Sequence, residues 1–147
     1  MDKKIAIACD HAGYELKLSI IAYLEEKGLE VKDFGTFSDE SVDYPDYAHP
    51  LGQALQDGSF TRGITLCGSG NGINMVANKY SKIRSALCWN AEIAELARKH
   101  NDANACALPA RFISEENALK IVDVFLNTSF EGGRHQRRIE KIPLKGL

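Results

Sequence analysis

The sequence predicts an α/β fold in which a parallel sheet lies between two layers of helices. Five short apolar segments alternate along the chain with segments whose apolar residues recur at three- and four-residue spacing. This regular alternation is typical of parallel strands joined by helices that cover both faces of the sheet. The prediction is a three-layer α/β/α sandwich around a Rossmann-like five-stranded parallel sheet.

The first part of the chain is expected to provide three of the strands. The first of them, Ile5–Cys9, is short and apolar. Leu16, Ile20 and Leu24 then mark one face of a helix. Gly28, a residue type that favours helix C-termini, ends that helix. The other elements expected here are a half-buried strand at Glu30–Phe34, a polar loop at Asp39–Pro45, a helix at Ala48–Leu55 and a buried strand at Gly63–Leu66.

The second part of the chain continues the same alternation. A helix is expected from about Ile73 to Asn78, and strands are expected at Ile83–Cys88 and Ala103–Leu108. Asn90 and Ser114 have side chains that can cap the helices that follow them. The inner face of the first of these helices is predicted to hold Ile93, Ala97 and His100, and that of the second Ala118, Ile121, Val122, Phe125 and Leu126.

Chain length and net charge exclude several classes of function. A chain of 147 residues is expected to form a single domain, residues 1–147. The formal net charge of −2 argues against a nucleic-acid surface. Residues 1–4 lead directly into a strand and do not resemble a signal peptide. No apolar run reaches the roughly 20 residues that span a bilayer, so we expect no membrane partner and a cytoplasmic protein.

The cysteines are expected to be buried thiols in a reducing compartment, with one exception. No Cys-x-x-Cys pair occurs, and no histidine spacing suggests zinc, so no metal is expected. Cys9, Cys88 and Cys106 lie in or at the end of predicted strands and read as small apolar residues. Cys67 differs because glycines open the space that follows it.

The glycine-rich turn after Cys67 is the most informative segment. Three glycines alternate with Ser69 and Asn71 between a buried strand and a helix start. Backbone N–H groups in such a turn point at one spot and can hold an anion. A thiol beside an anion hole suits proton abstraction next to a carbonyl, where an enediolate must be stabilised. A dinucleotide loop is the weaker alternative, because Ile73 occupies the position of the last glycine in Gly-x-Gly-x-x-Gly.

Parallel strands place the residues that follow them at one edge of the sheet. Asp10 and His11 follow the first strand, Cys67 ends the third, and Arg111 follows the fifth. His100 lies differently, because a helix of roughly 16 Å carries it from this edge toward the opposite one. It could therefore serve the site of a neighbouring subunit.

Five separated motifs, in order, resemble the B-type ribose-5-phosphate isomerases, a family that also includes galactose-6-phosphate and allose-6-phosphate isomerases. The resemblance runs from residue 3 to about residue 140. Pro109 departs from the family pattern, which has glycine before the Ala-Arg pair. The motifs are Cys9-Asp10-His11-Ala12-Gly13, Asp43-Tyr44-Pro45, Cys67-Gly68-Ser69-Gly70, His100-Asn101-Asp102-Ala103-Asn104 and Gly132-Gly133-Arg134-His135-Gln136-Arg137-Arg138.

The resemblance implies a cofactor-free and metal-free interconversion of ribose 5-phosphate and ribulose 5-phosphate through a cis-enediolate, in the non-oxidative pentose phosphate pathway. Cys67 matches the catalytic base, Ser69 the hydroxyl residue of the loop, and His100 the residue that opens the furanose ring. Asp10 matches a ligand of the sugar hydroxyls or ring oxygen, and the N–H groups of Gly68, Ser69, Gly70, Asn71 and Gly72 match the anion cradle. His11, Arg134 and Arg138 match phosphate ligands, and Asn101 and Arg111 match other substrate-binding positions.

The resemblance also implies a site shared between two subunits of a homodimer or tetramer, with the segment from about residue 130 to 147 contacting the partner. Arg134 and Arg138 would share a face if their segment is helical. Two alternatives stay open. One is a hexose-6-phosphate isomerase that acts on galactose or allose 6-phosphate. The other is a non-catalytic module that binds a sugar phosphate or a nucleotide.

Overall fold

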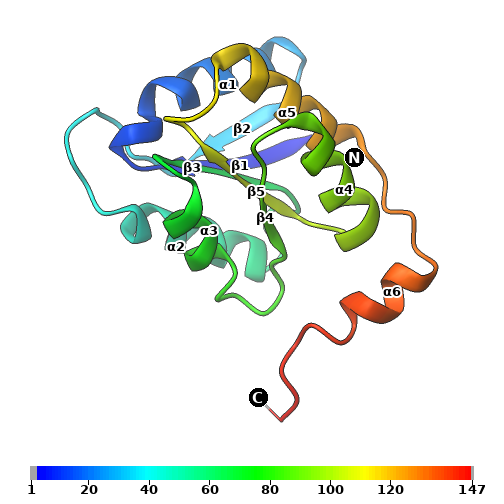
Figure 1. Ribbon diagram of the computed structural model, residues 1–147. Helices are drawn as coiled ribbons and strands as arrows, with labels where there is room; N and C mark the ends of the chain where they lie inside the picture. The colour runs from blue at the N-terminus through cyan, green and yellow to red at the C-terminus, as the bar shows by residue number, and fades with distance from the viewer. Residues whose placement is uncertain (1–2, 147) are drawn as a thin grey trace.

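The computed structural model describes residues 3–146, and Met1, Asp2 and Leu147 of the predicted 1–147 domain lie outside them. The strands and helices alternate as predicted (Figure 1). The strands are β1 (Lys4–Cys9), β2 (Glu30–Asp33), β3 (Gly63–Cys67), β4 (Ser85–Leu87) and β5 (Ala105–Pro109). The helices are η1 (His11–Gly13), α1 (Tyr14–Glu26), α2 (Tyr44–Gln56), α3 (Asn71–Ala77), α4 (Ala91–Asn101), α5 (Glu115–Asn127) and α6 (Arg134–Ile139).

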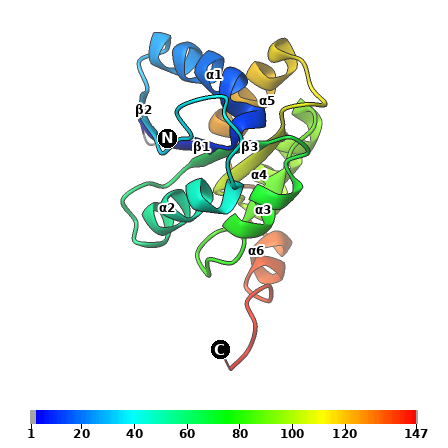
Figure 2. The same cartoon turned by 90° about the vertical axis from the view of Figure 1, so that its left-hand side faces the viewer.

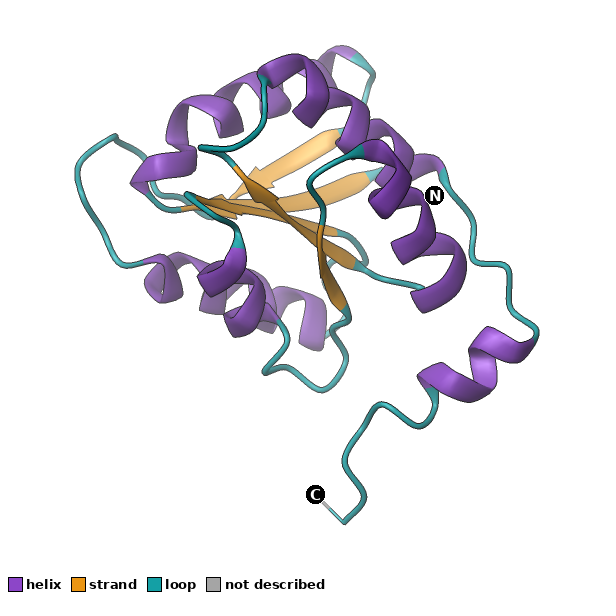
Figure 3. Ribbon diagram, in the orientation of Figure 1, coloured by secondary structure: helices purple, strands orange, loops and turns teal. Residues whose placement is uncertain are grey.

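The five strands form one parallel sheet in the order β2-β1-β3-β5-β4. Helices α1, α4 and α5 cover one face, and α2 and α3 cover the other (Figures 2 and 3). The predicted three-layer sandwich is confirmed. Helix α6 contacts α4, and the segment after it extends away from the sheet (Figures 1 and 2).

The two faces of the sheet carry side chains of different size. Successive residues of a strand point to opposite faces. Ile5 and Ile7 of β1 therefore pack beneath α1 and α5 with Phe125, which is fully buried. Ala6 and Ala8 lie on the opposite face, and Ala107 of β5 contributes to a small cluster beneath α3. Because alanine side chains are small, the backbones of α2 and α3 can approach the backbone of the sheet closely on this face.

Several boundaries differ from the sequence prediction. Helix α2 begins at Tyr44, inside the expected loop, because Pro45 in the first turn has no N–H to lose there and its φ suits a helix. Strand β4 is confined to Ser85–Leu87. Helix α4 buries Ala94, Ala97 and Arg98.

The predicted inner face of α4 is therefore wrong in part. Ile93 is only partly buried, although it packs against the core. His100 is partly exposed and faces α6, because Arg98 takes the buried position two residues before it. Arg98 can be buried there because its guanidinium donates to the carbonyls of Ala103 (2.7 Å) and Thr128 (3.0 Å).

All four cysteines are buried free thiols, which confirms the prediction for Cys9, Cys88 and Cys106, and Cys67 is also buried although glycines follow it. Within residues 3–146 no helix is both long enough and apolar enough to cross a bilayer.

Candidate active site

The carboxyl ends of β1, β3 and β5 bring most of the predicted residues together. In the sheet register Cys9 lies opposite Leu66, and Cys67 lies opposite Pro109. The loops after β3 and β5 are also joined directly, because the Ala110 N–H donates to the carbonyl of Cys67 at 2.9 Å. Asp10, Cys67 and the segment around Arg111 therefore meet at one edge.

Cys67 ends β3 with only 5 % of its surface exposed, and the glycine loop opens directly after it. Gly70 has φ 77°, a left-handed conformation that favours glycine. A Cβ at Gly70 would also lie 2.5 Å from Leu87 Cδ1 and 3.2 Å from the Pro109 nitrogen. The chain turns here because no side chain obstructs it, and α3 starts at the next residue.

Ser69 and Asn71 shape the exposed side of this loop. The Ser69 hydroxyl accepts hydrogen bonds from the backbone N–H and the side-chain amide of Asn71, both at 3.3 Å. The N–H groups of the first helical turn of α3 have no helical carbonyl before them and face the loop. These N–H groups are the ones that are predicted from the sequence to form an anion cradle.

Asp10 lies beside the loop and is 7 % exposed. Its backbone N–H donates to the Leu66 carbonyl at 3.2 Å, which ties the end of β1 to β3. One carboxylate oxygen accepts the Ala12 N–H at 2.9 Å and so caps η1. Asp10 is thus held by its neighbours at the carboxyl edge of the sheet.

His11 is held in one tautomer by the loop that follows β2. The Val42 N–H donates to His11 Nδ1 at 3.1 Å. Because Nδ1 must supply its lone pair to this bond, the neutral ring carries its proton on Nε2. An Nε2–H group is the donor that a phosphate oxygen requires.

A fully buried lysine anchors the same loop at its start. The Lys17 ammonium of α1 lies 2.7 Å from Asp33 Oδ1 and donates to the Thr36 carbonyl. The same Asp33 oxygen accepts the Gly35 N–H at 2.8 Å. Burial raises the pKa of the nearby Cys9 thiol to about 11, although the Lys17 charge opposes this shift. Sequence reasoning missed Lys17 because the residue lies within an ordinary amphipathic helix.

Tyr44 is a second contact that sequence reasoning did not assign. A Cβ at Gly72 would lie 2.5 Å from the Tyr44 ring, so the ring lies directly against the glycine loop. The motif Asp43-Tyr44-Pro45 could have indicated this contact, although the sequence alone favours a turn at this motif. Gly72 is needed at this position to admit the ring.

Arg111 lies against the other side of the loop. Its N–H donates to the Gly68 carbonyl at 3.0 Å, and its Nη1 lies 3.2 Å from where a Gly68 Cβ would be. Pro109 is the last residue of β5 and does not prevent this placement.

The remaining predicted residues lie at the opposite edge of the sheet. The carbonyl of Asn101, at the end of α4, accepts a hydrogen bond from Arg84 Nε at 2.9 Å, and Arg84 immediately precedes β4. His100 stacks on His135 of α6, with ring centroids 4.2 Å apart and planes inclined by 12°. Cys67 and His100 of one chain therefore belong to different edges.

The segment that holds Arg134 and Arg138 is helical, so the two arginines share one face of α6 as expected. Arg134 and Arg138 are exposed and one turn apart, whereas His135 and Ile139 are buried against the body. A pocket of about 400 Å³ lies beside them, lined by His100, Asn101, His135, Arg138, Ile139 and Ile142.

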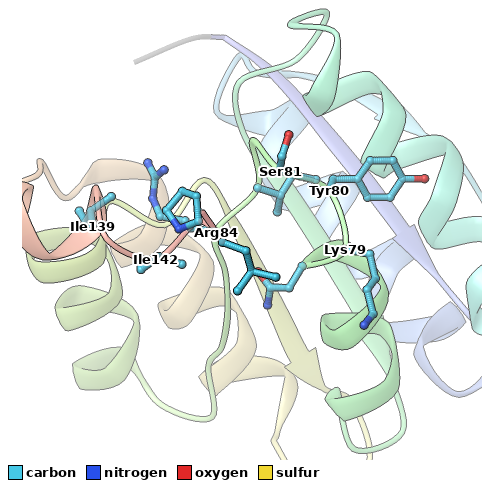
Figure 4. A pocket seen from close by; sticks show the side chains of 10 residues that line it. Lys79, Tyr80, Ser81, Arg84, Ile139 and Ile142 are labelled. Carbon is cyan, nitrogen blue, oxygen red and sulfur yellow. The ribbon is translucent and has the colours of Figure 1, made fainter. Parts of the chain in front are cut away.

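A larger pocket of about 550 Å³ lies between the segment after α3 and the C-terminal segment (Figure 4). Lys79, Tyr80 and Arg84 line one side, and Ile139 and Ile142 line the other. It is lined by none of the predicted site residues.

Comparison with known proteins shows similarity over nearly the whole chain. Residues 5–142 match the family model described as ribose/galactose isomerase. The chain is 47% identical to ribose-5-phosphate isomerase B of Escherichia coli K12 over 140 residues, which is 95% of this chain and 94% of that protein.

Solved structures show the same similarity. The ribose 5-phosphate isomerase of Thermotoga maritima is 54% identical, with a TM-score of 0.92 over 94% of this chain and 95% of that one. Ribose-5-phosphate isomerase B of Mycoplasma genitalium, with bound ribulose-5-phosphate, is 43% identical, with a TM-score of 0.90 over 95% and 93% of the two chains.

Proposed function

This chain belongs to the ribose/galactose isomerase family, and on that premise we propose that it interconverts ribose 5-phosphate and ribulose 5-phosphate. The observation that carries the proposal is the buried Cys67 thiol at the end of β3, opening onto the Gly68–Gly72 loop at the start of α3. This is an arrangement of a base beside an anion hole. The bound ribulose-5-phosphate of the Mycoplasma genitalium relative supports the same substrate pair.

In the proposed mechanism Cys67 acts as the base. Its thiolate takes the proton from C2 of the open-chain aldose and returns it to C1, while the hydroxyl proton passes from O2 to O1, so the carbonyl moves from C1 to C2. Negative charge develops on the oxygens of the enediolate between these steps. The N–H groups of the loop and of the first turn of α3 stabilise that charge.

Asp10 and Ser69 complete the sugar side of this half-site in the proposal. The Asp10 carboxylate can accept a hydrogen bond from a sugar hydroxyl, including the hydroxyl that the ring oxygen becomes when the furanose opens. The Ser69 hydroxyl lies on the exposed side of the loop, where it can donate to a substrate oxygen.

Ring opening is assigned to His100 of a second chain. A furanose opens when a proton leaves the anomeric hydroxyl and another reaches the ring oxygen, and an imidazole can perform both transfers near neutral pH. His100 lies at the amino edge of its own sheet, so it can act beside Cys67 only if another subunit supplies it. The active unit in this proposal is a homodimer with shared sites.

The phosphate would be held by His11 of one chain and by Arg134 and Arg138 of the other. The tautomer of His11 gives it an outward Nε2–H donor, and the two arginines share one face of α6. Charge-assisted bonds from two guanidinium groups suit a phosphate. Asn101 beside His100 and Arg111 beside Gly68 are the further substrate-binding residues in this proposal.

The segment from about residue 130 to 147 is proposed to contact the partner subunit. Beyond α6 it extends away from the sheet, and Ile142 and Leu144 along it are 58% and 73% exposed. Phe112, next to Arg111 at the carboxyl edge, is 76% exposed. Large apolar side chains exposed beside incomplete half-sites are typical of a protein interface.

The two alternatives are not favoured. Named relatives and solved neighbours are ribose-5-phosphate isomerases, which argues against a galactose or allose 6-phosphate substrate. A non-catalytic binding module would not need a thiol at the end of β3. We place the enzyme in the cytoplasm and in the non-oxidative pentose phosphate pathway.

The direct test is to incubate the protein with ribose 5-phosphate in the presence of a chelator and to measure ribulose 5-phosphate. Turnover that is lost in Cys67→Ala supports the proposal. Turnover of galactose or allose 6-phosphate with none of ribose 5-phosphate would reject it.

A further inference from the structure

Three side chains of metal-ligand type meet at the end of α4. His100 comes from that helix, Glu131 from the segment before α6, and His135 from α6 itself. One ligand atom from each lies within 4.8 Å of the others. The Glu131 N–H donates to the Lys99 carbonyl at 3.1 Å, so the backbone holds this segment against α4.

The imidazole of His135 gives the second, independent observation. His135 is only 6% exposed, and its Nε2 has no hydrogen-bond partner among residues 3–146. The nearest carboxylate oxygen, Glu131 Oε2, lies 3.7 Å away, which is too far for a hydrogen bond. A buried polar atom without a partner carries a free-energy cost, and a ligand in this cluster would remove it.

We propose that His100, Glu131 and His135 form a binding site for a divalent transition-metal ion such as Zn²⁺, and that the bound ion inhibits the isomerase by occupying His100. Two imidazoles and one carboxylate are a donor set that zinc prefers, with a fourth position left for water.

The site closes by side-chain rotation. Zinc binds nitrogen at about 2.0–2.1 Å, so tetrahedral ligands lie about 3.3 Å from one another. Ligand atoms up to 4.8 Å apart must therefore approach by about 1.5 Å at most. Glu131 is exposed and His100 partly exposed, so both side chains can turn, and the stacked rings must rotate out of their parallel arrangement.

The surrounding charges set the affinity. Arg134, Arg138 and Lys99 lie near the cluster and repel a dication, whereas Glu131 is the acidic member. The ion should therefore bind reversibly as an inhibitor and should not act as a resident part of the catalyst. The predicted inhibition depends on the proposed function, because it assumes that His100 opens the sugar ring and a metal-bound imidazole nitrogen has no lone pair for that step. The predicted metal binding does not depend on the proposed function.

Untagged protein should be titrated with Zn²⁺ by calorimetry and with Co²⁺ by visible absorption. The wild type is expected to bind about one ion per chain, and Glu131→Gln and His135→Gln to weaken binding by about tenfold or more. Glu140→Gln, an exposed glutamate on the same C-terminal segment, is the matched control and should bind as the wild type does. Cys67→Ser should also bind normally, which would place the ion away from the thiols.

Isomerase activity measured in the presence of Zn²⁺ tests the predicted inhibition separately. Glu131→Gln should keep the parent turnover of ribose 5-phosphate and should need about tenfold more Zn²⁺ for the same inhibition. Absence of binding, or equal binding in the folded Glu131→Gln and His135→Gln variants, would overturn the site. Binding to the site without loss of turnover would overturn the inhibition. An inactive protein that still binds Zn²⁺ at this site would reject the proposed function and keep the metal site.

Discussion

Cys67→Ala and His100→Ala chains, each inactive alone, are expected to regain activity when they are mixed and exchange subunits. Cys67 ends β3 at the carboxyl edge, whereas His100 lies near the end of α4. Helix α4 has 11 residues and therefore runs about 16 Å away from the edge where it starts. In the proposed dimer a complete site therefore takes Cys67 from one chain and His100 from the other.

The size of the recovery follows from this geometry. Random pairing of equal amounts gives about half mixed dimers, and each of these has one site with both residues intact and one site with neither. The mixture should therefore reach about a quarter of the wild-type activity. Loss of a general base lowers a rate roughly 10²–10⁴-fold, so the Cys67→Ala parent contributes about 1% or less of that signal.

The measurement is ribulose 5-phosphate formation after native mass spectrometry has confirmed mixed dimers. The control is the chain that carries both substitutions, mixed with an equal amount of wild type. Shared sites leave about a quarter of the activity in that control, whereas sites contained in one chain leave about half. Mixed dimers without recovered activity, or a control at one half, would refute the shared site.

Three further outcomes are expected. Arg138→Ala should raise KM roughly 10- to 100-fold, because a charge-assisted contact with the phosphate is lost. Arg137→Ala on the same helix should leave KM unchanged, and equal KM values for the two variants would remove Arg138 from the phosphate site. Val42→Pro deletes the N–H that fixes the His11 tautomer, so KM should rise roughly two- to tenfold while Val42→Ala leaves it unchanged. Burial raises the pKa of Cys9 from 9.0 to about 11, so its contribution to stability is complete below pH 9 and is lost as the pH rises toward 11. Urea unfolding should show this loss, roughly 2–3 kcal/mol, and Cys9→Ala should lack it.

Sequence periodicity predicted the layers because each strand and helix carries its own pattern of burial. Ile5–Cys9 and the α5 face from Ala118 to Leu126 were recognisable for that reason. The sheet order was not predictable, since β4 pairs at the edge beyond β5 through contacts that no local pattern encodes.

The candidate site also has one part that the sequence could predict and one part that it could not. Strand ends in a parallel sheet share an edge, so Asp10, Cys67 and Arg111 could be grouped from sequence, and the helix length was enough to separate His100 from them. The contacts of Val42 with His11 and of Tyr44 with Gly72 could not be predicted. Both depend on how an irregular loop returns over the sheet, and no periodic signal describes such a path.

The alanine-rich face of the sheet has a consequence for the catalytic loop. Helix α3 and Cys67 pack on Ala48 and Ala107, which are fully buried, and methyl groups added to a packed core are destabilising. A larger residue at either position would move α3 outward and change the distance between the thiol and the N–H groups beside it. The tolerance of this chemistry to mutation is therefore set partly by two alanines that lie beneath the site and never meet the sugar.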